Sequence, residues 1–266
     1  MIATRMFRGT CRLTIVIFAC LGMITGCETT PQTTSAEPDQ NTLRVGVSTN
    51  APPLIYKSGG KIGGLEAEFA RAFANYLGKS LQFVELKWDD QISALLDNKI
   101  DIIMSGMSIT KLREMRIAFS EPYFRSGQMA LIRSRDLTLF RSGYYSIVKT
   151  EKVGYVKNTT GEYFIQKFAL DTRVSAFSTS KKGVEALIDE KIDVFIHDAP
   201  IILYLASEFE AKGVTPLYSL LTEEYLAWAI RIEDTALLAA ANNFLKKSKE
   251  DGTLSPMIQR WIPLSK

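Results

Sequence analysis

The chain has 266 residues, of which 46% are hydrophobic and 23% charged, a composition typical of a globular protein and unlike that of a disordered or collagen-like chain. Its formal net charge of +3 comes from 32 basic and 29 acidic side chains, and the excess lies at the front, in Arg5, Arg8 and Arg12. Nucleic-acid binding gains no support, because it needs a basic face on the folded domain. The single histidine excludes a histidine-rich metal site, and we expect neither a metal nor a cofactor.

The first 26 residues have the pattern of an export signal. Residues 1–12 are basic and residues 13–26 are apolar, a run that suits the core of a signal peptide and is too short to span a bilayer comfortably. The run ends just before Cys27, and this junction resembles a lipobox, in which the cysteine is lipidated and becomes the new N-terminus. An ordinary signal peptide or a short membrane anchor is the alternative interpretation.

Lipidation of Cys27 would anchor the protein to a membrane. Cys11 and Cys20 lie within the predicted signal, so the mature chain would keep no thiol for a disulfide or for nucleophilic catalysis. Residues 27–41 are polar after the cysteine, which predicts a flexible tether. We therefore expect a lipid-anchored body in the periplasm or at the outer face of the cell membrane.

The folded body starts with alternating strand and helix patterns. Short apolar runs predict strands, and runs with apolar residues on one face predict helices. Their alternation predicts an α/β fold with a mostly parallel sheet. In chain order we expect a strand over residues 43–47, a helix from Gly64 to Gly78, a strand over 81–86, a helix starting at Asp89 or Asp90, and a strand over 100–104.

One stretch of this pattern returns later in the chain. Residues 94–104 (ALLDNKIDIIM) and 186–196 (ALIDEKIDVFI) are identical at six of eleven positions. The alternative is a chance match, or a sequence pattern that βα units have in common. We favour two lobes that are built on one plan and face each other. Ligands of α/β sheets lie beyond the C-terminal ends of strands. The residues that would then line one cleft are Ser105, Gly106, Met107 and Ser108 after the first Lys-Ile-Asp strand, and His197 and Asp198 after the second.

Two stretches are predicted to cross between the lobes. Residues 128–133 run from the first lobe to the second, and residues 225–232 run back. Two crossovers permit hinge closure around a ligand. The expected organisation is a signal peptide over 1–26, a tether over 27–41, lobe I over 42–130 plus 227–266, and lobe II over 131–226.

Several motifs between Leu43 and Trp261 are found together in one family. The longest is the run from Lys99 to Phe124, and it is joined by residues 64–68, 88–89, 153–154, 158–162, 191–193 and 197–198. In these motifs the chain resembles the family 3 extracellular solute-binding proteins, the amino-acid receptors of ABC importers. The resemblance implies a two-lobe periplasmic-binding-protein fold of type II with two crossover strands. It also implies a monomer that captures a ligand by lobe closure and delivers it to an ABC importer permease in the inner membrane.

A free amino acid presents a carboxylate, which must not be buried without a partner. Arg113 offers a planar fork suited to it. Ser108 and the backbone N–H groups of Gly106 and Met107 can donate to the same oxygens, and Thr160 lies at a predicted helix start that favours an anion. By resemblance, Arg113, Ser108 and Thr160 stand at the family's carboxylate-binding positions. Alone, Arg113 would be interpreted as a charge on a helix surface.

The ammonium group of the ligand needs an acid. Asp198 is placed to receive it and matches the family's ammonium-binding position. The alternative role for Asp198 is that of a helix cap, because Pro200 and a helical run follow it.

The side-chain pocket is where the sequence departs from the family. Members that bind polar or basic amino acids often carry an acid and an aromatic residue after the first strand, where this chain has Ser48 and Ala51. A pocket for a cationic side chain is therefore not expected. The run from His197 to Pro200, with residues 202–204, is similar to the glutamine-binding members of the family, and a polar L-amino acid is the ligand we expect. Asn50 in the same loop is a further candidate for ligand contact.

Three other residues bear on this pocket. Trp88 can provide one flat wall, or it can be a core tryptophan. His197 can hydrogen-bond a ligand side chain as a neutral imidazole, although a lone histidine is more often structural. Asn158 replaces a glycine common in the family, which affects backbone freedom at the lobe II anion site.

Rival functions remain open. Relatives of this fold include dehydratases, for which Glu66, Asp198 and His197 would be the general acid or base candidates. The sequence has no Ser-His-Asp pattern, nucleophile elbow, metal-ligand spacing or phosphate loop, so we expect no catalytic residue. A lipoprotein that senses its ligand and a lipoprotein with a purely structural role are two further rivals.

Overall fold

The computed structural model describes residues 41–168 and 173–263. The predicted signal peptide, Cys27 and almost all of the predicted tether lie outside the described residues. Within the described residues, no helix has the length and apolar character needed to cross a bilayer.

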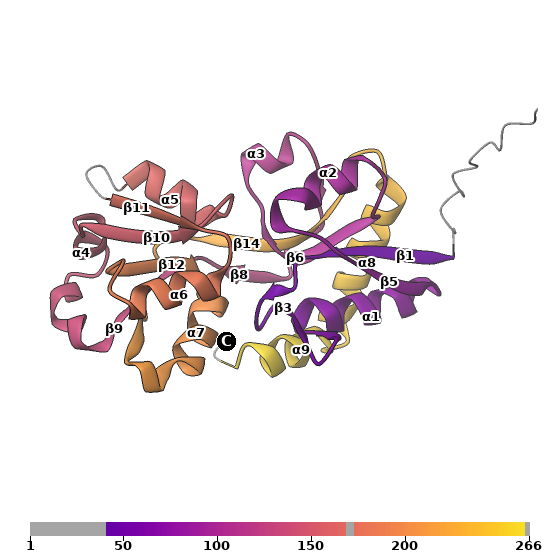
Figure 1. Cartoon of the computed structure of the whole chain (residues 1–266). Helices are drawn as coiled ribbons and strands as arrows, with labels where there is room; N and C mark the ends of the chain where they lie inside the picture. The colour runs from indigo at the N-terminus through magenta and orange to yellow at the C-terminus, as the bar shows by residue number, and fades with distance from the viewer. Residues whose placement is uncertain (1–40, 169–172, 264–266) are drawn as a thin grey trace, which may run out of the picture. The chain divides into compact units, whose positions relative to one another are not determined.

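The first sheet has the order β5-β1-β6-β14-β7 (Figure 1). Strand β1 is parallel to its neighbours β5 and β6, and β14 is antiparallel to β6. The strands of this lobe are β1 (Thr42–Val47), β5 (Ser80–Glu85), β6 (Ile102–Ser108), β7 (Ala118–Phe119), β8 (Phe124–Ser126) and β14 (Glu224–Ile230), with a small sheet of β2 (Asn50–Ala51), β3 (Ile55–Ser58) and β4 (Lys61–Gly63). Its helices are α1 (Leu65–Leu77), η1 (Trp88–Asp90), α2 (Gln91–Leu96), α3 (Lys111–Glu114), α8 (Thr235–Glu250) and α9 (Leu254–Trp261).

The second sheet has the order β11-β10-β12-β9-β13. Strand β10 is parallel to β11 and β12, and β9 is antiparallel to β12. Its strands are β9 (Gln128–Arg133), β10 (Lys152–Val156), β11 (Arg173–Phe177), β12 (Val194–Asp198) and β13 (Val214–Leu217). Its helices are η2 (Ser134–Phe140), α4 (Tyr144–Val148), α5 (Thr160–Phe168), α6 (Ser180–Ile188), α7 (Ala199–Glu208) and η3 (Glu210–Lys212).

The two sheets share one plan, as the internal repeat predicts. In β5-β1-β6-β14 and in β11-β10-β12-β9, three parallel strands are followed by one antiparallel strand. The repeated Lys-Ile-Asp segment leads into the third strand of each set, β6 or β12. The predicted two-lobe α/β fold is therefore confirmed.

The strands that carry the site are longer than predicted. We expected Ser105 to Ser108 to follow a strand that ends at residue 104, but β6 continues to Ser108 because β14 pairs with it as far as Leu226 opposite Ser108. In the second lobe, His197 and Asp198 are the last residues of β12, held by pairing with β9. These six residues therefore lie within strands and not in the loops that follow them.

The chain crosses between the sheets twice, slightly before the predicted positions. Residues 128–133 lie wholly in the second sheet as β9, so the first crossing is at Gly127. The return lies between β13 and β14, which then stays in the first sheet beside β8 (Figure 1). A Cβ on Gly127 would lie 2.0 Å from the carbonyl oxygen of Thr222, which belongs to the return segment. The two crossing segments are therefore in backbone contact.

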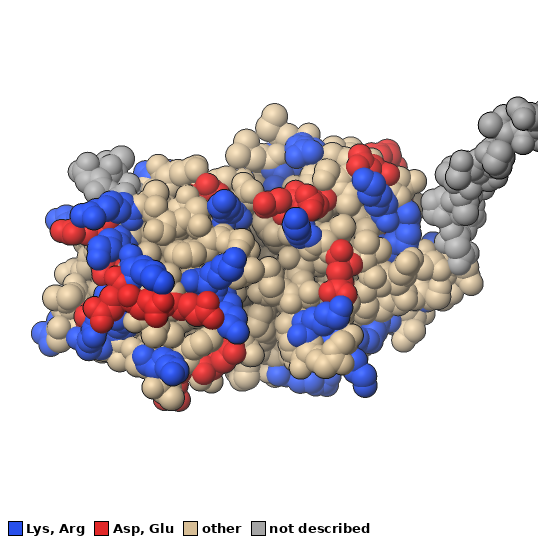
Figure 2. Space-filling model, viewed as in Figure 1, with Lys and Arg blue, Asp and Glu red and all other residues tan. Residues whose placement is uncertain are grey.

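Acidic and basic side chains lie next to one another on both lobes, on the face that Figure 2 shows. Exposed ion pairs of the described chain include Arg135 with Glu190 and Lys57 with Glu85. Mixed signs agree with the near balance of charge in the sequence beyond its first residues.

Candidate functional site

A small cavity of about 40 Å³ lies between residues of the two lobes. All the predicted ligand-binding residues except Met107 line it. First-lobe lining residues are Asn50, Ala51, Trp88, Ser105, Gly106, Ser108 and Arg113, and second-lobe lining residues are Val156, Thr159, Thr160, Ser178, Thr179, Ser180, His197, Asp198 and Ile201. Met107 is buried in a hydrophobic cluster of the first lobe, with Leu95 and Ile103, and it does not line the cavity. Its predicted place in the cavity is therefore wrong.

Arg113 is buried, with 6% of its surface exposed, although it belongs to the short helix α3. The hydroxyl of Thr110 caps this helix by accepting from the Arg113 backbone N–H at 3.3 Å. The guanidinium donates from Nη1 to the Ser108 carbonyl at 2.7 Å, and lies 5.4 Å from the Trp88 ring centroid. Burial lowers the pKa of Arg113. The helix-surface interpretation of this charge therefore does not hold.

Ser108 is already engaged by an acid that sequence reasoning missed. Its hydroxyl donates to Oε2 of Glu224 at 2.6 Å, and Oε1 of Glu224 accepts from the Thr222 hydroxyl at 2.7 Å. Glu224 is the first residue of β14, directly after the return crossing. Since a hydroxyl has one proton, Ser108 can donate to a ligand only by leaving Glu224.

The predicted donation from the Gly106 backbone is wrong. Gly106 has a φ of +69°, and its N–H donates at 2.5 Å to Oε1 of Glu66, which is buried on α1. The same carboxyl group accepts from the Tyr123 hydroxyl at 2.6 Å and from the indole N–H of Trp228 at 3.1 Å. Burial raises the pKa of Glu66 to about 7. Glu66 therefore does not face the cavity, and it stabilises β6, the strand whose residues line the cavity.

Asp198 is 9% exposed and is held by a residue that sequence reasoning also missed. The side-chain amide of Gln128 donates to Oδ1 of Asp198 at 2.5 Å and to the Thr160 hydroxyl at 2.9 Å. Asp198 stands at the N-cap of α7, yet within the described chain its carboxylate makes no capping hydrogen bond. The carboxylate therefore remains available to the cavity, against the alternative of a helix cap.

His197 lies beside Asp198 with one ring nitrogen engaged. Nδ1 of His197 accepts from the Asp198 backbone N–H at 2.8 Å and lies 3.5 Å from Oδ2 of Asp198. The contact with the backbone N–H needs a bare Nδ1 that accepts, whereas the contact with Oδ2 would need an N–H at Nδ1. We favour a bare Nδ1, because the backbone N–H can only donate and its distance is the shorter one. A neutral ring then carries its proton on Nε2 and can donate from that atom.

The remaining predicted residues contact the opposite lobe. Trp88 lines the cavity and donates from its indole N–H to the Asn158 carbonyl at 2.9 Å, so it is a wall and not a core tryptophan. Asn158 has a φ of +58°, the left-handed region that favours glycine and tolerates asparagine. The Asn50 carbonyl accepts from the Ser180 hydroxyl at 3.3 Å.

The rest of the cavity lining is neutral. Among the lining residues that the structure describes, Arg113 and Asp198 are the charged ones. Residues 178–180, missed in the sequence, add hydroxyl groups at the end of β11. Ser48 does not line the cavity, and its backbone N–H donates to the Ser105 hydroxyl at 3.0 Å. Over the described ranges, no cluster of three or more histidine, cysteine or acidic residues is placed to hold a metal ion.

Known proteins are similar to this chain in sequence and in fold. The ABC transporter glutamine-binding protein GlnH of Bacillus subtilis is 28% identical over 240 residues, which cover 88% of this chain and 86% of that protein. The ancestral amino acid-binding protein AncCDT-1, a precursor of cyclohexadienyl dehydratase, is 32% identical with a TM-score of 0.77, over 84% of this chain and 95% of that one. An ancestral arginine-binding protein bound to arginine is 29% identical with a TM-score of 0.78, over 84% of this chain and 98% of that one.

A family model also matches most of the chain. It covers residues 43–264, a range that contains the strands that carry Ser108 and Asp198. The chain belongs to the bacterial extracellular solute-binding proteins, family 3.

Proposed function

We propose that the protein captures a neutral polar L-amino acid between its two lobes and delivers it to an ABC importer. The observation that carries this proposal is a pair of buried opposite charges in one cavity, Arg113 from the first lobe and Asp198 from the second. An amino acid offers the matching carboxylate and ammonium, and burial of either without a partner is costly. The amino-acid ligands of the relatives support the same class.

A neutral ligand side chain follows from the charges of the lining. Once Arg113 and Asp198 are engaged by the ligand backbone, a cationic or anionic side chain would have no counter-charge among the described lining residues. The hydroxyl groups of residues 178–180 and the Nε2–H of His197 suit a ligand side chain that carries an amide or hydroxyl group.

The site supports binding more than catalysis. The fold neighbour AncCDT-1 is a precursor of a dehydratase, so a dehydratase-like enzyme is the alternative. Of the three acid–base candidates, Glu66 is fully buried and is not part of the cavity lining. Asp198 would be paired with the ligand ammonium in this proposal, and Nδ1 of His197 is engaged by a backbone amide.

We further propose that Cys27 carries a lipid, which holds a monomer in the periplasm or at the outer face of the cell membrane. The partner would be the permease of an ABC importer in the inner membrane. A lipoprotein that senses its ligand without transport is the alternative, and uptake by cells that lack this protein separates the two.

The test is identification of the ligand. Mass spectrometry of small molecules released from purified, denatured protein should find an amino acid with a neutral polar side chain. Calorimetry with the common amino acids should then rank that ligand first, and proton NMR of the mixture should show it unchanged after hours. Preference for arginine or lysine would contradict the neutral class, and conversion of the ligand would favour the enzyme.

A further inference from the structure

Asn158 is the residue through which the second lobe contacts the first at one side of the cavity. Its carbonyl oxygen accepts from the indole N–H of Trp88 at 2.9 Å and from Nη2 of Arg113 at 3.4 Å. Its side-chain amide donates to Oδ1 of Asp89 at 2.8 Å. Three first-lobe side chains thus meet on one residue of the second lobe.

The local backbone presents Asn158 for these contacts. Its N–H donates to Oε2 of Glu162, in the first turn of α5, at 2.6 Å. With a φ of +58°, Asn158 turns the chain between the end of β10 and the start of α5. Glycine would adopt this conformation more easily, but glycine lacks the amide that reaches Asp89.

Two spaces share these residues. Trp88 and Arg113 line both the ligand cavity and a second, more open pocket of about 500 Å³, which Asn158 also lines. Nη1 of Arg113 is held by the Ser108 carbonyl of its own lobe, and Nη2 by the Asn158 carbonyl of the other lobe. The guanidinium is therefore fixed from both lobes only while they are together.

We propose that Asn158 is a cross-cleft latch: its amide on Asp89 and its carbonyl on Trp88 and Arg113 hold the lobes together and position the guanidinium for the ligand. The latch goes beyond the proposed function, because it acts on the lobes whatever the ligand is. The amide of Asn158 donates to a charged acceptor, which makes this hydrogen bond one of the stronger kind. It is the part of the latch that a glycine at this position would lose.

The test measures lobe opening without any ligand. Two exposed lysines, Lys61 on β4 and Lys181 on α6, are replaced by cysteine and spin-labelled, with the three native cysteines replaced by serine. Pulsed electron resonance gives the distance distribution between the labels. In the wild-type background we expect a population at the short distance of the closed lobes.

The variants are N158G, which keeps the left-handed backbone, and D89A. Each should lower the ratio of closed to open molecules by about three- to tenfold, and the double variant should lower it no further than either single one. N98G, another asparagine with a φ of +58°, and D90A, next to Asp89, are the matched controls and should leave the ratio unchanged.

The latch would be overturned by an unchanged ratio in N158G or D89A, or by additive effects in the double variant. It would also be overturned by an equal effect of the controls, or by a wild type without a closed population. Because no amino acid is present, none of these results bears on the proposed ligand. Thermal melting of every variant checks that the loss of closure is not a loss of folding.

Discussion

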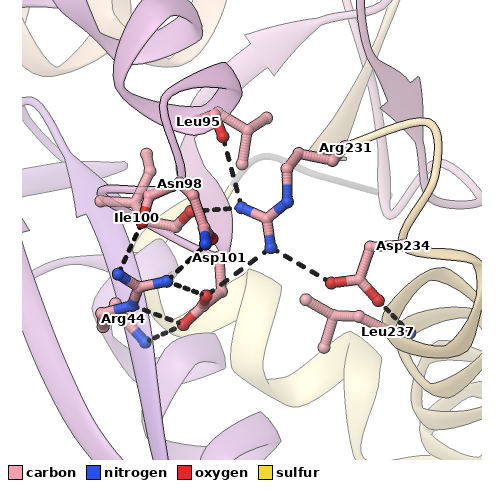
Figure 3. Close-up of polar contacts among 8 residues, drawn as sticks. All are labelled: Arg44, Leu95, Asn98, Ile100, Asp101, Arg231, Asp234 and Leu237. Carbon is pink, nitrogen blue, oxygen red and sulfur yellow. Dashed lines mark hydrogen bonds and ion pairs between the residues drawn. The ribbon is translucent and has the colours of Figure 1, made fainter. Parts of the chain in front are cut away.

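Arg133 and Arg231 occupy equivalent positions in the two lobes. Arg133 ends β9 and Arg231 directly follows β14, the antiparallel strands of the two sheets. Nη1 of Arg231 donates to the carbonyls of Ile100 at 2.6 Å and Leu95 at 3.3 Å, and Nη2 lies 3.3 Å from Oδ2 of Asp234 (Figure 3). The arginine thus ties the end of one helix to the strand that follows it.

The second lobe repeats the arrangement with its own residues. Nη1 of Arg133 donates to the carbonyls of Ile192 at 2.6 Å and Leu187 at 3.1 Å, and its Nε lies 2.6 Å from Oδ2 of Asp136. Ile192 and Leu187 are the positions that match Ile100 and Leu95 in the repeated segment. In both lobes the acid follows the arginine by three residues.

Replacement of either arginine should destabilise the fold. Arg231→Met and Arg133→Met each remove a largely buried charge and leave backbone carbonyls without their donor, so we expect a loss of about 2–4 kcal/mol in the free energy of unfolding. Arg135→Met, which breaks an exposed pair with Glu190, should cost less than about 1 kcal/mol. Urea denaturation measures all three, and equal losses at Arg135 and Arg231 would contradict this role.

Loss of either charge in the cavity should weaken ligand binding strongly. Removal of one partner of a buried charge pair costs about 3–5 kcal/mol, so Arg113→Ala and Asp198→Ala should each weaken binding about a hundredfold to a few thousandfold in calorimetry. Both residues would contact the ligand backbone, so the order of preference among amino acids should not change. The exposed neighbour Arg116→Ala is the control, and near-native affinity in Arg113→Ala would refute the carboxylate site.

Trp88 and His197 should act in the opposite way. They line the cavity without carrying the paired charges, so Trp88→Ala and His197→Ala should change the order in which amino acids compete. A competition series in calorimetry separates the two kinds of variant. An equal loss for every amino acid would show that neither residue contacts the ligand side chain.

Glu66 should make folding stability depend on pH. Its pKa is raised from 4.5 to about 7 by burial, so between these values the folded state keeps a proton that the unfolded state has lost. The free energy of unfolding should therefore fall as the pH rises from about 4.5 to about 7, by about 3 kcal/mol in total, and level off above. Urea denaturation of Glu66→Gln across this range should lack this decrease, and parallel curves for the two proteins would rule out Glu66 as its source.

Cys27→Ser should release the protein from membranes. The lipobox-like junction motivates this prediction, and labelled palmitate should be incorporated into the wild-type chain alone. Incorporation that persists in the variant would show that another residue carries the lipid.

The sequence allowed the lobes and most of the cavity lining to be predicted, because both depend on local patterns. The repeated segments place Ser105 and His197 at equivalent positions of β6 and β12, and the family motifs add Arg113 and Thr160. Hydrogen-bond directions were beyond such patterns. The N–H of Gly106 donates to Glu66, which lies forty positions away in the chain. The residues next to Gly106 in sequence give no sign of this hydrogen bond.

Gln128 and Glu224 were missed for a related reason. Each begins a strand next to a crossing segment, where an isolated polar residue resembles an ordinary loop boundary. Their roles follow from tertiary contacts, with Asp198 for Gln128 and with Ser108 for Glu224. The repeated Ile-Arg-x-x-Asp motif at residues 132–136 and 230–234 is the signal that would have located the crossings more closely.

The backbone contact at Gly127 limits which amino acids evolution can place in the hinge. Every residue other than glycine brings a Cβ against the Thr222 carbonyl oxygen, so a library randomised at position 127 and selected for folded protein should return glycine. At Gly59 and Gly60 no described atom lies within 4 Å of such a Cβ, and asparagine should be recovered there, because it tolerates their positive φ. Sequence change that tunes how far the lobes open must therefore occur beside Gly127 and not at it.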